Sequence, residues 1–263
     1  MFHRLESLWM IEVKAVTIEP FVTQAATEEA KDTVIDALRK TLSKPEPDLV
    51  PLVMEEDGKK YAVITGNSLK GTFRSIISAQ LTKAGKDVCV QDVKLGDSGL
   101  PEGRKEQCKP DNPCFVCKWF GTAGRQGALH FGFLRSVKPL EEILAFEPIP
   151  MIAIRDDTKA VAKRAFLLIA PVKKGVEFRG WIKGENLDEE ILGAIAEVFE
   201  MSKAGFVQLG GLKTRGYGRI SMEITKIEKY SGAPFKLEKK YEGKELEEFL
   251  KCCRSKYHEM LKS

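Results

Sequence analysis

The sequence has no long hydrophobic run, few histidines and little net charge. No apolar stretch approaches the roughly 20 residues that a membrane-spanning helix needs, and the first residues lack the apolar core and cleavage site of a secretory signal. The three histidines, His3, His130 and His258, are too few and too scattered for a histidine-based nuclease site. A net charge of +4 does not by itself indicate a nucleic-acid partner. We therefore expect a soluble, cytoplasmic protein whose function depends on local motifs.

The order of the predicted elements is typical of an α+β fold. With 263 residues, of which 43% are hydrophobic, the chain can bury a sizeable core. Residue patterns predict, in order, a strand, a helix, two strands, a helix and a strand, at residues 8–19, 68–84, 128–134, 175–183, 187–204 and 219–228. This is the ferredoxin-like βαββαβ arrangement, which is also the frame of many RNA-recognition domains. We predict one domain over residues 1–228 with insertions at 86–127 and 139–175, followed by a C-terminal helical extension over 229–263.

The first motif, ITGNSLKGTFR, marks the start of the first predicted helix. Gly66 lets the chain turn tightly, and Asn67 or Ser68 can cap a helix whose first free N–H groups face an anion. Lys70 and Arg74 stand one turn apart, opposite the apolar stripe, which is an arrangement that suits a phosphate backbone. For this motif alone, a capped helix with two solvated cations is the better interpretation.

The second motif, LGGLKTRGYGR, is rich in glycine and in basic residues. Its glycines, among them Gly210 and Gly211, remove side chains so that backbone amides can approach a ligand closely. Tyr217 offers a ring on which a base can stack, and three cations offer phosphate contacts. These cations are Lys213, Arg215 and Arg219. A flexible hairpin loop is the alternative interpretation, and the density of glycine and basic residues weakens it.

Four of the six cysteines lie in one region, which indicates a metal site more than a disulfide framework. Cys108, Cys114 and Cys117 form a C-x5-C-x2-C pattern in a loop rich in glycine and proline, and Cys89 is the expected fourth ligand. His130 is the alternative fourth ligand, and buried free cysteines are the alternative to a metal. Because four protein ligands leave no open position for catalysis, we expect a structural zinc ion that holds the insertion together.

The two motifs together resemble those of the CRISPR-associated RAMP (repeat-associated mysterious protein) superfamily. That family pairs a G-x-S-L-K-G-x-x-R helix start with a late G-G-x-x-x-R-G-x-G-R loop, and both patterns stand in this chain. Two further stretches match: CKWFGTAG at 117–124, and the segment from IRDD at 154–157 to KGVEF at 174–178. The resemblance runs in order over residues 8–228, and the chain looks most like the backbone subunits of type III effector complexes.

The resemblance implies a subunit that binds CRISPR guide RNA along the RNA backbone. Such subunits stack head to tail on the guide, as further copies of themselves or of related subunits, together with other CRISPR effector subunits. A thumb-like insertion kinks the guide at regular intervals, and we assign this role to residues 139–175. Six basic residues there could continue a track of cations from the two motifs, and a solvated charged insertion is the alternative: Arg155, Lys159, Lys163, Arg164, Lys173 and Lys174.

In several type III members, an aspartate in the loop after the first strand helps to cut the complementary target RNA with a divalent metal. By this resemblance the candidate is Asp32, with Asp36 as the alternative and Mg²⁺ as the metal. The sequence departs from the family at this place, because residues 24–26 replace the usual glycine pair and Thr33 stands where a proline follows the aspartate. The surrounding residues favour a helix, so a solvated helical carboxylate is the alternative.

Two other functions compatible with the residues stay open. One is a stand-alone endoribonuclease of the same superfamily that processes guide RNA. The other is a zinc-containing interaction module that binds no nucleic acid. The expected difference is that a backbone subunit binds RNA stoichiometrically and with a strong dependence on salt.

Overall fold

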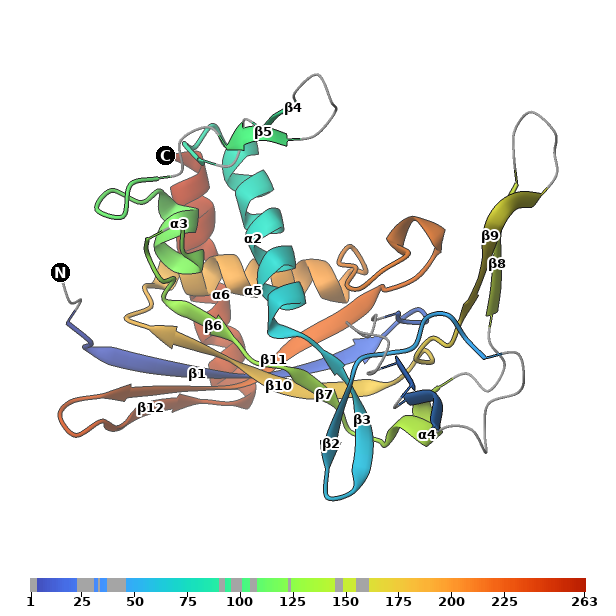
Figure 1. The fold of residues 1–263 in the computed structure, drawn as a ribbon. Coiled ribbons are helices and arrows are strands. Elements are labelled where there is room, and N and C mark those ends of the chain that lie inside the picture. Colours follow the sequence, from blue (N-terminus) through green and yellow to red (C-terminus); the bar gives the residue numbers. More distant parts are fainter. Residues whose placement is uncertain are drawn as a thin grey trace.

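The computed structural model describes residues 4–22, 31–32, 34–36, 46–89, 93–95, 101–104, 108–122, 124–144, 149–154 and 161–263. In this part of the chain, eight strands form one sheet in the order β12-β11-β1-β10-β7-β3-β2, and β6 pairs with β10 alongside β7 (Figure 1). Every pairing in the sheet is antiparallel. The strands are β1 (Ser7–Thr17), β2 (Val53–Glu56), β3 (Lys59–Ile64), β6 (Leu129–Phe131), β7 (Leu134–Ser136), β10 (Glu177–Glu185), β11 (Ile220–Ser231) and β12 (Lys236–Tyr241).

Strand β1 lies at the centre of the sheet, with β10 along one edge and β11 along the other. Trp9, Ile11, Val13 and Ala15 are buried, and the side chains between them are half-buried. This alternation places one face of the sheet against the hydrophobic core and leaves the other face partly exposed. The strand predicted at 8–19 is therefore confirmed, and it ends two residues earlier than expected.

Helices α2 (Gly66–Lys83) and α5 (Glu189–Lys203) cover the buried face of the sheet (Figure 1). The apolar side of α2 carries Leu69, Phe73, Ile77 and Leu81 at intervals of four residues, as the sequence predicts, and all four are buried. Phe73 packs edge-on against Phe199 of α5, with 5.5 Å between the ring centroids. These two helices and the sheet thus share a single core.

The connectivity of these elements is compatible with the predicted ferredoxin-like fold. Helix α2 comes between β1 and the β6–β7 pair, and α5 comes between β10 and β11. The sheet order β11-β1-β10-β7 places β1 and β10 inside and the other core strands outside. Strands β2, β3 and β12 widen the sheet at its two edges. The chain is therefore an α+β protein built on an antiparallel sheet.

The C-terminal segment packs tightly against the core. Strand β12 pairs with β11, and helix α6 (Gly243–Lys262) packs along α5. A Cβ atom at Gly193 would collide with the backbone carbonyl of Cys253, so glycine permits the close approach of the two helices. Tyr257 is buried, and its hydroxyl donates a 2.9 Å hydrogen bond to Gln80 of α2. The predicted C-terminal extension contains a helix, as expected, and also β12, whereas the domain boundary at residue 228 stays a prediction.

The two insertions contain short elements that the sequence patterns did not indicate. The first holds a β4–β5 pair and helix α3, and the second holds helix α4 and a β8–β9 ribbon that extends away from the sheet (Figure 1). Their bounds are β4 (Val93–Leu95), β5 (Pro101–Arg104), α3 (Phe115–Phe120), α4 (Leu140–Ile143), β8 (Ile149–Ile154) and β9 (Val161–Ile169). In the second insertion, prolines and charges obscure the period-2 pattern by which strands are recognised.

Some sequence predictions fall outside the described residues. These are residues 24–26, Thr33, Arg155 and Lys159. Within the described part of the chain, no helix is both long and apolar enough to cross a bilayer.

Candidate functional site

The two motifs, which lie far apart in the sequence, line the same clefts. One cleft of about 470 Å³ lies between the first turns of α2 and the chain at 206–213, and its walls include Asn67, Ser68, Gln208 and Lys213. A neighbouring cleft of about 440 Å³ shares Ser68 and is closed on the other side by Gly210 and Gly211. The fold therefore brings the start of the first motif to the glycine-rich loop of the second.

The glycine-rich loop is fastened to the segment that follows β1. The N–H group of Gly211 donates to the carbonyl of Val22 at 2.9 Å, and that of Gly218 donates to Pro20 at 2.9 Å. Gly210 adopts a φ of 79°, and a Cβ there would collide with the Val22 carbonyl. These contacts hold both ends of the loop. They weaken the alternative interpretation as a flexible hairpin.

The start of α2 has a defined cap and a close neighbour. The hydroxyl of Thr65 accepts a 3.2 Å hydrogen bond from the N–H of Ser68, so Thr65 takes the capping position that we expected at Asn67 or Ser68. A Cβ at Gly66 would collide with the backbone carbonyl of Phe131 in β6. Glycine is therefore required here for the close packing of the helix on β6, and not for a left-handed turn.

Two cations of the second motif are free to meet a ligand. Lys213 and Arg215 lie in the short helical turn η1 (Lys213–Arg215), and both are exposed. Neither has an ion-pair partner among the residues that the structure describes. Arg219 differs, because its guanidinium forms a 3.0 Å ion pair with Glu19. The loop therefore presents Lys213 and Arg215 as its available positive charges.

The two cations of the first motif have different surroundings. The guanidinium of Arg74 donates to the carbonyl of Gly121 at 3.2 Å and lies 3.7 Å from the sulfur of Cys117. It therefore contacts the first insertion and does not line either cleft. Lys70 is half-buried, and burial together with the nearby Arg74 lowers the pKa of its ammonium group. An anion close to Lys70 would reverse this effect.

Tyr217 is buried. Its side chain is 8% exposed and packs with Val22 and Ile169 in a small second hydrophobic cluster. The same burial raises the pKa of its hydroxyl. In this structure the Tyr217 side chain packs the loop against the core, and the stacking role that we expected for its ring stays a prediction.

Sequence reasoning missed several residues of the larger cleft. Phe206 and Gln208 line it from one side, and Gly71, Thr72 and Ser75 line it from α2. A usable pattern was present in α2, because Ser68, Thr72 and Ser75 recur at helical spacing away from the apolar stripe. For Phe206 there was no such pattern, since its exposure depends on how the chain leaves α5.

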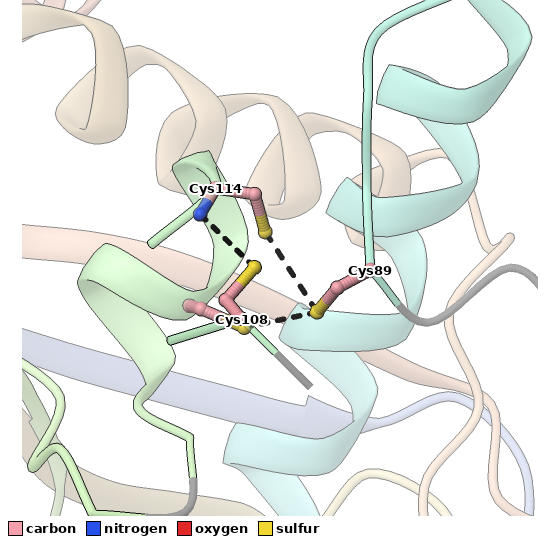
Figure 2. Close-up of side chains that lie close together, drawn as sticks. Cys89, Cys108 and Cys114 are labelled. Carbon is pink, nitrogen blue, oxygen red and sulfur yellow. Dashed lines mark hydrogen bonds between the residues drawn. The ribbon is translucent and has the colours of Figure 1, made fainter. Parts of the chain in front are cut away.

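The four predicted cysteines form one cluster. Their sulfur atoms all lie within 4.8 Å of one another. Figure 2 shows three of the residues converging: Cys89 from the segment that follows α2, Cys108 from the chain before α3, and Cys114 from the start of α3. The sulfurs of Cys89 and Cys117 are 3.1 Å apart, and those of Cys89 and Cys114 are 3.9 Å apart. Zinc–sulfur bonds of about 2.3 Å in a tetrahedron require sulfurs about 3.8 Å apart. The cluster can therefore hold a metal ion such as zinc.

Of the two expected fourth ligands, the structure favours Cys89 over His130. Cys89 belongs to the cluster, whereas His130 lies on β6 with its Nε2 3.3 Å from a carboxylate oxygen of Glu185. Burial raises the pKa values of the Cys108 and Cys117 thiols, so a bound metal would have to displace their protons. The guanidinium of Arg74 lies beside Cys117 and would offset the negative charge of a metal–thiolate centre.

The two candidate aspartates are exposed. Asp32 and Asp36 fall on helical residues, and Val34 and Ile35 beside them are buried in the main core. Within the described residues, the four cysteines are the only group of three or more side chains placed to share a metal. A Mg²⁺ site does not need such a group, because Mg²⁺ commonly takes one or two carboxylates and completes its shell with water and phosphate. A role for Asp32 or Asp36 with Mg²⁺ therefore stays a prediction.

Comparison with known proteins gives one result that covers most of the chain. The family model described as the RAMP superfamily matches residues 21–221, a span that includes both motifs and all four clustered cysteines. No curated protein matches the sequence.

Proposed function

The chain belongs to the RAMP superfamily, and from this premise we propose that it is a guide-RNA-binding backbone subunit of a type III CRISPR effector complex. Its partners are then CRISPR guide RNA, the complementary target RNA, other effector subunits and further copies of itself or of related subunits. Family membership supports a CRISPR-associated role in RNA binding. The assignment to a type III backbone subunit goes further and rests on the two motifs and their arrangement.

The observation that carries the proposal is the pair of clefts between the two motifs. Backbone and hydroxyl groups at the start of α2 form one side, and the glycine-rich loop with Lys213 forms the other. Donors of this kind bind phosphate and sugar oxygens without reading the base sequence. Arg215 lies in the same turn as Lys213 and is exposed, so a sugar-phosphate strand that follows the clefts meets two cations.

The two insertions fit the same role. A structural zinc ion held by the cysteine cluster would join the start of the first insertion, at Cys89, to the loop at Cys108 and to α3 through Cys114 and Cys117. The β8–β9 ribbon in the second insertion extends from the body of the protein, as a thumb-like element that inserts into a guide would (Figure 1). Strand β9 includes Lys163 and Arg164 of the predicted basic track.

The proposal is tested by the salt dependence of binding to single-stranded RNA. The probe is a short, fluorescein-labelled oligouridylate, and the assay is fluorescence anisotropy over a range of salt concentrations. On a single strand, each phosphate contact contributes about −0.7 to the slope of log K against log salt, so each lost contact makes the slope shallower by about 0.7. The double variant Lys213→Ala, Arg215→Ala is therefore expected to bind more weakly, with a slope that is shallower by about 1.4.

A matched control removes the same charge elsewhere. Lys244 and Lys251 are exposed on α6, away from both clefts, and the variant Lys244→Ala, Lys251→Ala has the same net charge as the test variant. We expect its slope to equal that of the wild type. Wild-type protein that does not bind the oligouridylate, or equal slopes for the two double variants, would contradict the proposal.

A further inference from the structure

Phe206 has an unusual position for a large apolar side chain. Its side chain is 76% exposed, the highest value among the exposed large hydrophobic residues of the described chain. Single exposed apolar residues are common and need no explanation by themselves. Phe206, however, lines the larger cleft, where hydroxyl and amide groups surround it.

The backbone holds Phe206 in place. Helix α5 ends with the N–H of Gly205 bonded to Ser202 at 2.9 Å and the N–H of Phe206 bonded to Met201 at 3.0 Å, which is a Schellman motif. The buried hydroxyl of Ser202 also accepts a 2.9 Å hydrogen bond from the N–H of Met222 in β11. In a Schellman motif the residue at the place of Phe206 commonly packs back on the helix. Because the ring is so exposed, most of its surface is left for another contact.

On the α2 side of the cleft, Gly71 leaves the helix backbone uncovered by a side chain. Gly71 lies in the interior of α2, where glycine is less favourable for a helix than alanine. A Cβ at Gly71 would meet no atom within 4 Å, so packing within the described protein does not require glycine there. Gly71 faces the same cleft as Phe206, with Ser75 one turn further along the helix. A flat ligand can approach the backbone of α2 at this point.

We propose that this cleft binds one base of single-stranded RNA, with the base stacked on the ring of Phe206. This inference rests on the proposed function. It adds a subsite for the base to the phosphate contacts that the cations make. The volume of about 470 Å³ lies within the range of small-ligand sites. Lys213 on the rim is placed for the phosphate of the same nucleotide, and the amide of Asn67 is placed for polar groups of the base or sugar.

Stacking tolerates every base, because every base has a flat π face. The subsite is therefore expected to strengthen binding without imposing a sequence. This suits a protein that holds the backbone of RNA whose sequence varies.

The test compares Phe206→Ala with Phe206→Tyr, using the oligouridylate above and a second copy that carries 2-aminopurine. The fluorescence of 2-aminopurine falls when the base stacks on an aromatic ring. For Phe206→Ala we expect binding weaker by about tenfold, an unchanged salt slope and less quenching of 2-aminopurine. Phe206→Tyr keeps the ring, so it should retain affinity and quenching. The control is Phe235→Ala, an exposed phenylalanine in the turn between β11 and β12.

The outcomes separate the subsite from the proposed function. Wild-type affinity and wild-type quenching in Phe206→Ala would overturn the subsite while salt-dependent RNA binding remained. A loss of affinity in Phe235→Ala equal to that in Phe206→Ala would also overturn it. Wild-type protein that binds neither RNA would refute the proposed function itself. Because the side chain of Phe206 is mostly exposed, its removal should leave the folded structure intact.

Discussion

Replacing Gly71 by alanine should make the protein more stable and at the same time a weaker RNA binder. Gly71 lies in the interior of α2, its φ is not in the left-handed region, and a Cβ there meets no atom within 4 Å. Alanine therefore adds no strain and removes the entropy that glycine loses on folding. We expect the free energy of unfolding to rise by about 0.5–1 kcal/mol.

The effect on binding has the opposite sign. The added methyl group enters the cleft at the point where the proposed base approaches the helix backbone. We expect affinity for the oligouridylate to fall at least about fivefold, which corresponds to roughly 1 kcal/mol. Thermal unfolding gives the stability, where 1 kcal/mol corresponds to about 2–4 °C in a chain of this size. Anisotropy gives the affinity.

A reversed substitution on the same helix provides the control. Ala79 is exposed on α2 and lines neither cleft, so Ala79→Gly should lower stability by about the same amount and leave RNA affinity unchanged. The pair therefore separates stability from binding. If Gly71→Ala gained stability and bound RNA as the wild type does, no ligand would approach the helix there. If Gly71→Ala lost stability, the added Cβ would not be entering open space, and the description of Gly71 as an unobstructed part of the cleft would be wrong.

Two further predictions concern metals. Purified protein should contain zinc at about 1 mole per mole of chain. The variant Cys114→Ser should lose the metal and have a lower melting temperature. The control Cys252→Ser, at an exposed cysteine outside the cluster, should change neither the zinc content nor the melting temperature. Elemental analysis and thermal unfolding measure both, and a Cys114→Ser variant with full zinc content would contradict a four-cysteine site. In a reconstituted complex, Asp32→Asn should abolish the Mg²⁺-dependent cutting of target RNA and leave RNA binding intact, as measured by gel analysis of labelled target. Full cutting by Asp32→Asn with loss in Asp36→Asn would move the role to Asp36.

Local patterns predicted the elements whose side chains contact the core. The stripe from Leu69 to Leu81 marked α2, and alternating residues marked β1, because burial of one face leaves a period in the sequence. The cysteine spacing likewise predicted the cluster, since metal ligands must meet in space whatever the intervening loop does. Strands β8, β9 and β12 carry no comparable pattern and were not predicted.

The fates of individual site residues depended on tertiary contacts that the sequence does not display. Helical spacing correctly placed Arg74 away from the apolar stripe, yet α3 and the cysteines pack there and take its hydrogen bonds. Tyr217 looked like a stacking ring, but the loop folds back and buries it beside Val22. Phe206 was overlooked because its exposure is set by the end of α5 and the cleft beyond.

The most direct test of the central claim is photochemical crosslinking of bound RNA. An oligouridylate substituted with 4-thiouridine is irradiated in complex with the protein, and mass spectrometry then locates the attached nucleotides. The account predicts adducts on peptides from both walls, namely residues 66–76 of α2 and residues 206–219, which include Phe206 and the glycine-rich loop. Adducts confined to one of these segments, or found instead on α6 or on the exposed face of the sheet, would contradict it.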